Sequence, residues 1–218
     1  MKSLVEGLIE AVANDGVVSG WVRDAGLDAP CRMQVVLREM VLAEAVADRF
    51  RGDLLRAGVG HGFYGFAAHL RRPLPTGRAV VMLAVPDRGF RTPMMVAVPP
   101  LDPPRAASVE SLLVEPPGWV TGDLLAYPGC LRLAANYERL GAAAFVDAVF
   151  RFALGRWPSA AETCMNVDDL TRGRISAEGL LLDLLASPER ADMGPGLPSP
   201  FDADFPFELA GGDTGVTP

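Results

Sequence analysis

The sequence predicts a two-module protein of mixed β and α structure: an antiparallel β-sandwich over residues 1–98, followed by a small all-α domain. Short segments rich in β-branched and aromatic residues fill residues 1–98, and turn sequences separate them every roughly 8 to 12 residues, which is typical of an all-β sandwich or barrel. From residue 118 onward, apolar residues recur at the three- and four-residue spacing of helices instead. A chain of 218 residues is long enough for two modest cores.

Strands are expected where β-branched and aromatic residues gather between turns, at residues 17–22, 33–37, 41–46, 62–70, 79–85 and 94–98. The turns between them carry Gly, Pro, Asn and Asp, the residues that tight turns favour. Residues 49–57 interrupt this pattern and predict a helical turn over the sheet. Residues 99–118 contain three Pro-Pro pairs and predict a linker or an extended strap, because proline removes backbone donors.

Residues 119–193 predict a helical module with three marked helices. The first has one apolar face and ends at Gly155. The second begins at Ser159, which forms a capping box with Glu162, and the third begins at Ser176. Residues 194–218 hold four acidic and no basic residues with many Gly and Pro, so an acidic, flexible tail is expected, although its phenylalanines are unusually apolar for one.

Charge and hydropathy exclude several classes of protein. Residues 1–98 hold 12 basic and 10 acidic residues, whereas residues 99–218 hold 8 and 17, which argues against nucleic-acid binding. No apolar run approaches the roughly 18 to 20 residues of a membrane helix, so no membrane insertion is expected. Glu6 and Glu10 interrupt any signal-peptide core. We therefore expect cytoplasmic synthesis, with leaderless export to the cell surface or incorporation into a particle as possible routes.

The sequence offers little for catalysis. Its only histidines are His61 and His69, and no nucleophile elbow, zinc motif or P-loop is present. Residues 60–65 fit the Gly-x-Gly-x-x-Gly pattern, but a helical turn precedes them and a strand follows, the reverse of a dinucleotide site. Three scattered cysteines predict buried free thiols, with neither a disulfide framework nor a metal cluster. The expectation is a protein that is not an enzyme and has no cofactor, metal or catalytic residue.

Four residues of the predicted sandwich are candidates for ligand binding. His61 and Tyr64 form a polar-aromatic cluster at a loop edge, where binding surfaces are common. Trp21 and Arg23 share a strand, and two interpretations stay open for them: a sugar-stacking tryptophan with a hydrogen-bonding arginine, or a core tryptophan beside a surface ion pair. The sandwich is therefore predicted to carry the ligand surface.

The helical segment resembles a known family through residues 145–189. The resemblance rests on Phe145-Val146, on Phe152 with Leu154-Gly155-Arg156, on Leu170 with Gly173, and on Leu181 through Ser187-Pro188-Glu189. These residues look like the family catalogued as domain of unknown function 4214, which is itself similar to the linker domain of phycobilisomes. Members sit in exported, surface-layer and glycan-related bacterial proteins without assigned catalytic residues.

A second resemblance covers the N-terminal part, from Gly20-Trp21-Val22-Arg23-Asp24 through residues 47–54 to Gly62-Phe63-Tyr64-Gly65-Phe66. This part is similar to a small β-sandwich module that accompanies glycosyltransferases and polysaccharide-biosynthesis proteins in alphaproteobacteria. Together the resemblances imply a binding protein for a bacterial surface or capsular polysaccharide, or for a partner that handles one. The alternatives are a structural component of a surface layer or phage-like particle, with oligomers formed through the helical module or tail, and an accessory module of a glycosyltransferase.

Overall fold

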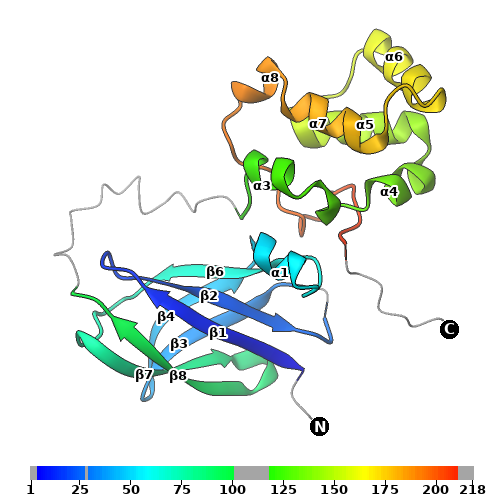
Figure 1. Cartoon of the computed structure of the whole chain (residues 1–218). Helices are drawn as coiled ribbons and strands as arrows, with labels where there is room; N and C mark the ends of the chain where they lie inside the picture. The colour runs from blue at the N-terminus through cyan, green and yellow to red at the C-terminus, as the bar shows by residue number, and fades with distance from the viewer. Residues whose placement is uncertain (1–3, 28, 101–117, 211–218) are drawn as a thin grey trace. The chain divides into compact units, whose positions relative to one another are not determined.

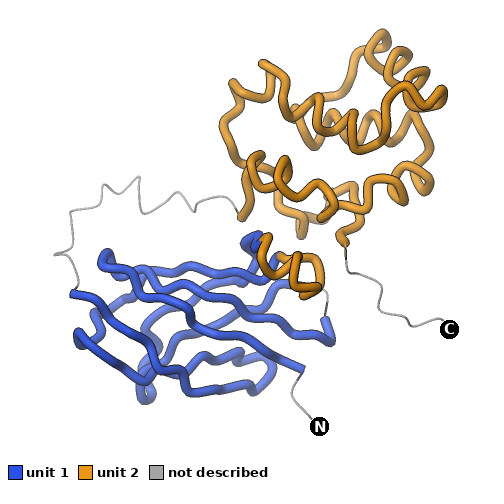
Figure 2. The backbone as a smooth tube through the Cα atoms, viewed as in Figure 1, with its two compact units in different colours: residues 1–51, 63–116 blue, residues 52–62, 117–218 orange. Residues whose placement is uncertain are grey.

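The computed structural model describes residues 4–27, 29–100 and 118–210 and divides the chain into two compact units. The sandwich unit holds residues 1–51 and 63–116, and the helical unit holds residues 52–62 and 117–218 (Figure 2). Two antiparallel sheets followed by several helices confirm the predicted mixed fold. Most of the predicted proline-rich linker, residues 101–117, lies outside the described residues.

Within the described residues, eight strands form the two sheets of the sandwich unit (Figure 1). One sheet has the order β1 (Val5–Val12), β2 (Val17–Asp24), β6 (Phe63–His69) and β5 (Arg49–Phe50). The other has the order β4 (Met40–Ala47), β3 (Cys31–Leu37), β7 (Gly77–Val85) and β8 (Phe90–Val98), with a 3-10 turn, η1 (Pro86–Arg88), between its last two strands. The first strand, β1, is not among the strands that the sequence predicts.

Strand β2 contributes every second residue to the core of the sandwich unit. On β2, Val18, Gly20, Val22 and Asp24 are buried in strict alternation with half-buried neighbours. Gly20 is required because a Cβ there would collide with the Leu8 carbonyl oxygen of β1 and approach the ring of Phe66. The inward row of β2 therefore lies close against β1 and the ring of Phe66.

Asp24 is the polar member of this inward row and is only 4% exposed. Its carboxylate accepts a hydrogen bond from the Gly26 amide at 2.9 Å and pairs with the Arg88 guanidinium at 2.6 Å. Burying a carboxylate is costly unless it is paired and hydrogen-bonded. Asp24 therefore ties the end of β2 to η1 by contacts that compensate its burial.

Short helices build the helical unit. They are α1 (Gly52–Arg56), α3 (Thr121–Ala126), α4 (Leu133–Leu140), α5 (Ala142–Leu154), α6 (Ala160–Thr171), α7 (Ala177–Leu185) and α8 (Pro188–Ala191), with a 3-10 turn, η2 (Pro128–Cys130), after α3. The helical turn predicted within residues 49–57 is α1, which follows β5 directly. No helix in the part of the chain that the structure describes is long and apolar enough to cross a membrane.

The centre of the helical unit is α5, whose C-terminal end the sequence predicts correctly. Gly155 terminates it in the left-handed conformation, with φ of 62°. Ser159 accepts from the Glu162 amide and Glu162 accepts from the Ser159 amide, so the predicted capping box starts α6. Ser176 caps α7 by accepting from the Gly179 amide.

Residues 194–210 complete the core of the helical unit, where the sequence predicts a flexible tail. The Trp119 indole donates to the Pro198 carbonyl oxygen at 2.7 Å. Phe205 and Phe207 pack edge-on against Phe152 of α5 at 5.7 and 5.4 Å between ring centroids. These aromatic rings cover an apolar face of α5 that the other helices leave open, which explains the difference from the prediction. Residues 211–218 lie outside the described residues.

Candidate functional site

The four residues that the sequence predicts to bind a ligand are divided between the two units. Trp21 and Arg23 lie on β2 and Tyr64 lies on β6, all in the sandwich unit, whereas His61 belongs to the helical unit. Arg23 lies over the Tyr64 ring at 5.4 Å and pairs with Glu6 at 3.6 Å. Arg23 and Tyr64 are therefore brought together within the sandwich unit.

His61 and Tyr64 are buried, at 0% and 2% exposure. The His61 ring lies 5.7 Å from that of Phe201, within the helical unit. Their glycine-rich surroundings predict a loop edge, but both side chains pack inside. Trp21 is half-buried, so it and Arg23 are the accessible members of the predicted group. The assignment of a ligand to the four residues stays a prediction.

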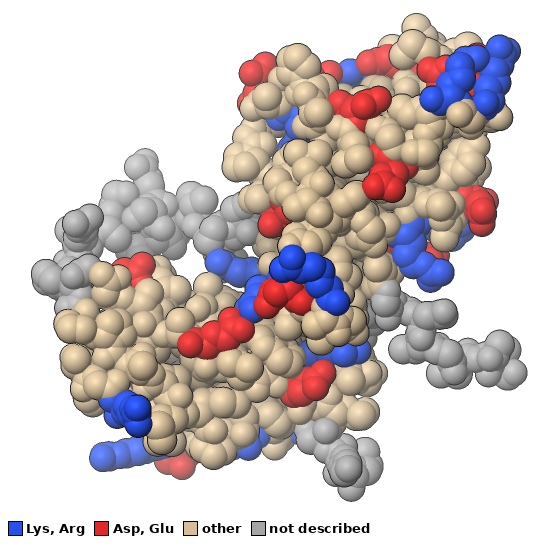
Figure 3. Space-filling view, in the orientation of Figure 1, with Lys and Arg blue, Asp and Glu red and all other residues tan. Residues whose placement is uncertain are grey.

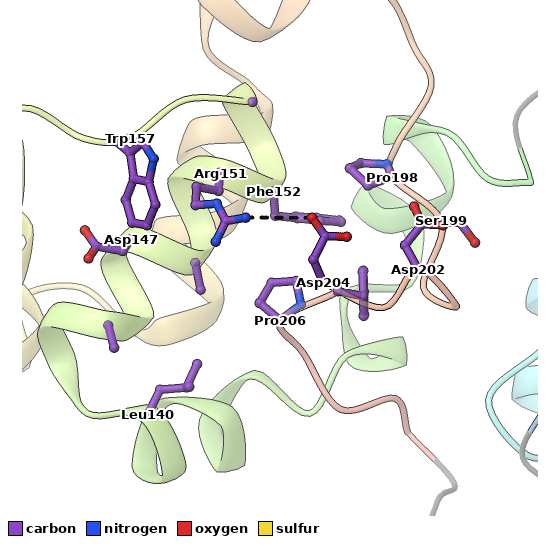
Figure 4. Close-up of a pocket in the computed structure, with 14 residues that line it drawn as sticks. Leu140, Asp147, Arg151, Phe152, Trp157, Pro198, Ser199, Asp202, Asp204 and Pro206 are labelled. Atoms are coloured by element: carbon purple, nitrogen blue, oxygen red, sulfur yellow. Dashed lines mark ion pairs between the residues drawn. The ribbon is translucent and has the colours of Figure 1, made fainter.

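A groove in the helical unit is a stronger candidate site. It lies between α5 and residues 198–206 and has a volume of about 500 Å³, within the range of roughly 300–1,000 Å³ typical of ligand pockets (Figure 4). Its walls combine apolar surface from Leu140, Phe152 and Pro206 with a few charged groups. The same C-terminal residues that complete the core thus form one wall of the groove.

The groove has an exposed tryptophan, Trp157, whose side chain is 63% exposed. The Arg151 guanidinium lies over its ring at 4.9 Å and pairs with Asp204 at 3.8 Å. In Figure 4, Arg151 lies between Trp157 and Asp204 and links the two walls of the groove. One face of the indole is thereby held by Arg151, and the ring stays available to a ligand.

The loop that carries Trp157 is anchored by its neighbour. The Arg156 guanidinium donates to the Trp157 carbonyl oxygen at 3.1 Å and to both carboxylate oxygens of Glu162 and of Glu189. These hydrogen bonds from Arg156 lower the pKa of Glu162 to about 2 and also lower the pKa of Glu189. Pro158 further favours an extended conformation for Trp157. The tryptophan is therefore presented from a fixed backbone.

Three carboxylates line the groove: Asp147 on α5, and Asp202 and Asp204 on the opposite wall. Neither Trp157 nor these carboxylates are among the residues that the sequence predicts to bind a ligand. The available signal was a tryptophan between a helix-ending glycine and a capping box, where no core position is expected. The far wall had no such signal, because residues 198–206 follow no helical or strand period.

The described residues hold no group of three or more His, Cys, Asp or Glu side chains that could bind a metal ion. Burial raises the pKa of the Cys130 thiol to about 12 and also raises that of Cys31, so both thiols are protonated at neutral pH. Both are buried as predicted, whereas Cys164 is exposed on α6 and the prediction was wrong for it. None of the three lines the groove.

Two further grooves lack an aromatic side chain. One, of about 400 Å³, lies on the sandwich unit beside Gln34 and Glu44, and the other, of about 440 Å³, lies between η2 and the start of α7. An aromatic platform with flanking hydrogen-bonding groups distinguishes the groove at Trp157 from both.

Comparison with known proteins adds no relative: no family model, curated protein or solved structure matches the chain. The two resemblances seen in the sequence therefore stay predictions. The residues that carry the helical resemblance nevertheless have a clear role here, since Arg156 of Leu-Gly-Arg and Glu189 of Ser-Pro-Glu form one ion pair at 2.5 Å.

Proposed function

We propose that the protein binds a polysaccharide without chemically changing it, and that the sugar lies in the groove at Trp157. The observation that carries this proposal is the exposed indole at a groove of ligand size, backed by Arg151 and flanked by carboxylates. Sugar rings present C–H faces that stack on aromatic rings, while their hydroxyls need polar partners. Trp157 supplies the first requirement, and Asp147, Asp202 and Ser199 supply the second.

The pre-organisation of the site supports the same function. Binding is stronger when the protein does not have to order its side chains. The Arg156 hydrogen bonds fix the backbone of Trp157, and Arg151 restrains its ring from one side. The resemblance of the helical segment to modules of bacterial surface and glycan-related proteins favours a surface or capsular polysaccharide as the class of ligand.

A matched pair of variants tests the proposal on a glycan array and by titration of the glycan that binds best. Trp157→Ala is expected to weaken binding about ten-fold or more, since truncating a central interface tryptophan costs about 2 kcal/mol. Its free energy of unfolding should change by less than about 1 kcal/mol, because the side chain is exposed. Trp21→Ala, the same substitution in the sandwich unit, should leave the affinity unchanged.

Other outcomes have defined meanings. If only Trp21→Ala loses binding, the ligand site lies on the sandwich unit, as the sequence predicts. An array on which no glycan depends on Trp157 would contradict the proposed function. Release of shortened sugars from a bound polysaccharide would show that the protein is an enzyme.

A role in assembly is the second candidate function, favoured by the outer face of the sheet that contains β7 and β8. Val80 and Met95 are exposed there and lie directly opposite each other in the strand register. Exposed apolar pairs on a sheet face are suited to contact another chain. Light scattering that shows oligomers in the natural protein but monomers in Met95→Lys would support this role, and a monomer throughout would exclude it.

A further inference from the structure

The charges of the groove at Trp157 point to a narrower class of ligand. Three carboxylates line it against a single guanidinium, that of Arg151. Arg151 is already engaged, because it pairs with Asp204 and lies over Trp157. Within the described residues, no cation pairs with Asp147 or Asp202, so two negative charges face the groove without compensation.

The placement of these carboxylates suits a ligand that lies against the tryptophan. Asp147 is one helical turn before Arg151 on α5, so the two share a face of the helix. In Figure 4, Asp147 and Trp157 lie on the same side of Arg151, while Asp204 lies on the other. Asp202 comes from the opposite wall. Asp147 and Asp202 therefore lie on either side of the Arg151–Asp204 ion pair, so a chain of several sugars lying along the groove would meet both carboxylates.

The surroundings of the groove strengthen this local charge. Residues 119–210 contain 7 basic and 13 acidic residues. Carboxylates are spread over the visible face of the helical unit in Figure 3. A surface of one sign attracts polymers of the opposite sign and repels those of its own. An acidic polysaccharide would be repelled both at long range and within the groove.

We infer that the groove takes an amino polysaccharide, whose hexosamine units carry free, protonated amino groups. This inference rests on the proposed function and names its ligand class. One sugar ring stacks on Trp157, and the ammonium groups of successive units donate to Asp147 and Asp202 in charge-assisted hydrogen bonds, which are stronger than those between neutral groups. Acetylation of the amine removes the charge and leaves the ring unchanged.

Two sugars that differ only in this charge test the inference. Isothermal titration compares short β-1,4-linked oligomers of glucosamine and of N-acetylglucosamine at about pH 5.5, where the amine is protonated and ordinary carboxylates are ionised. The amino oligomer is expected to bind at least about ten-fold more tightly at about 20 mM salt. Its advantage should shrink at about 300 mM salt, because salt screens the attraction.

Variants separate recognition from general attraction. The double variant Asp147→Asn, Asp202→Asn should abolish the preference for the amino oligomer, and Trp157→Ala should weaken binding of both oligomers. Asp183→Asn removes an exposed carboxylate of α7 outside the groove and is the matched control, with affinity unchanged.

Four results would overturn the inference, and the first three concern affinity differences. These three are equal affinity for the two oligomers, a preference that survives the double variant, and an equal loss of affinity in Asp183→Asn, which would indicate non-specific attraction. Absence of binding by the amino oligomer would overturn it as well. The proposed function is judged separately, since it stands if any glycan on the array depends on Trp157 and fails if none does.

Discussion

The two units of this protein close their cores in different ways. The sandwich unit uses neighbouring strands whose inward residues alternate, as Val18 and Val22 do on β2. The helical unit needs Phe205 and Phe207, which lie far along the chain from α5, to cover the ring of Phe152. A periodic pattern therefore marks the core residues of a strand such as β2, but no such pattern marks Phe205 and Phe207. The aperiodic segment that closes the second core also forms a wall of the groove, so fold and candidate function depend on the same residues.

The largest expected effect comes from breaking that closure. Phe207→Ala should cost about 3–5 kcal/mol of unfolding free energy in the helical unit, because it removes a buried ring and leaves a cavity. Hydrogen exchange should show lost protection in α5 and retained protection in β2. Phe66→Ala, in the sandwich core, is the matched variant. It should lower the protection of β2 and leave that of α5 unchanged. If the protection of α5 is unchanged in Phe207→Ala, the prediction of a flexible tail would be supported instead.

An intermediate effect is expected from the buried carboxylate of the sandwich unit. Asp24→Ala removes a hydrogen bond to the Gly26 amide and the ion pair with Arg88. Hydrogen bonds to charged groups contribute about 1.5–3 kcal/mol, so chemical denaturation should reveal a loss of that size. Glu39→Ala is the control, because its ion pair with Arg91 is long and highly exposed, and it should change stability by less than about 0.5 kcal/mol.

The smallest effect is a dependence on pH that belongs to the helical unit. Arg156 lowers the pKa of Glu162 to about 2, below that of an unfolded glutamate. A lowered folded-state pKa contributes stability above the unfolded-state value of about 4.3, and this contribution is lost as the pH falls towards 2. Thermal unfolding at several pH values should therefore show that the stability of Glu162→Gln falls less steeply than that of the natural protein as the pH is lowered below about 4.3. An unaltered pH dependence in this variant would mean that the Arg156 pairing has no net value.

The sequence predicts most of the fold because its local signals agree with it. Ser159, Ser176 and Gly155 mark helix ends through contacts within a few residues, and these predictions are confirmed. The strand β1 was missed because its register shifts between Ile9 and Ala11. Its buried residues, Val5, Ile9 and Val12, therefore do not keep a period of two.

The candidate site was less accessible to sequence analysis, because exposure depends on contacts between distant segments. Glycines around His61 and Tyr64 are typical of a loop, yet both side chains are buried. Trp157 resembles a core residue by its chemistry and is exposed because the helix before it ends at Gly155. Asp204, which pairs with Arg151, comes from a segment whose composition predicts disorder, so this ion pair could not be anticipated.

The late position of Phe205 and Phe207 in the chain sets an order of events during synthesis. Domains generally fold as units while the chain emerges, and the strands of the sandwich are all made before α5. When α5 leaves the ribosome, the phenylalanines that cover Phe152 have not yet been synthesised. The apolar face of α5 is therefore exposed to solvent at that stage. Only after Phe207 emerges does this face become hidden, and the groove forms in the same event. During this interval the exposed apolar face of α5 is a potential binding site for a chaperone. The groove is still incomplete at that stage, so it cannot yet bind a ligand.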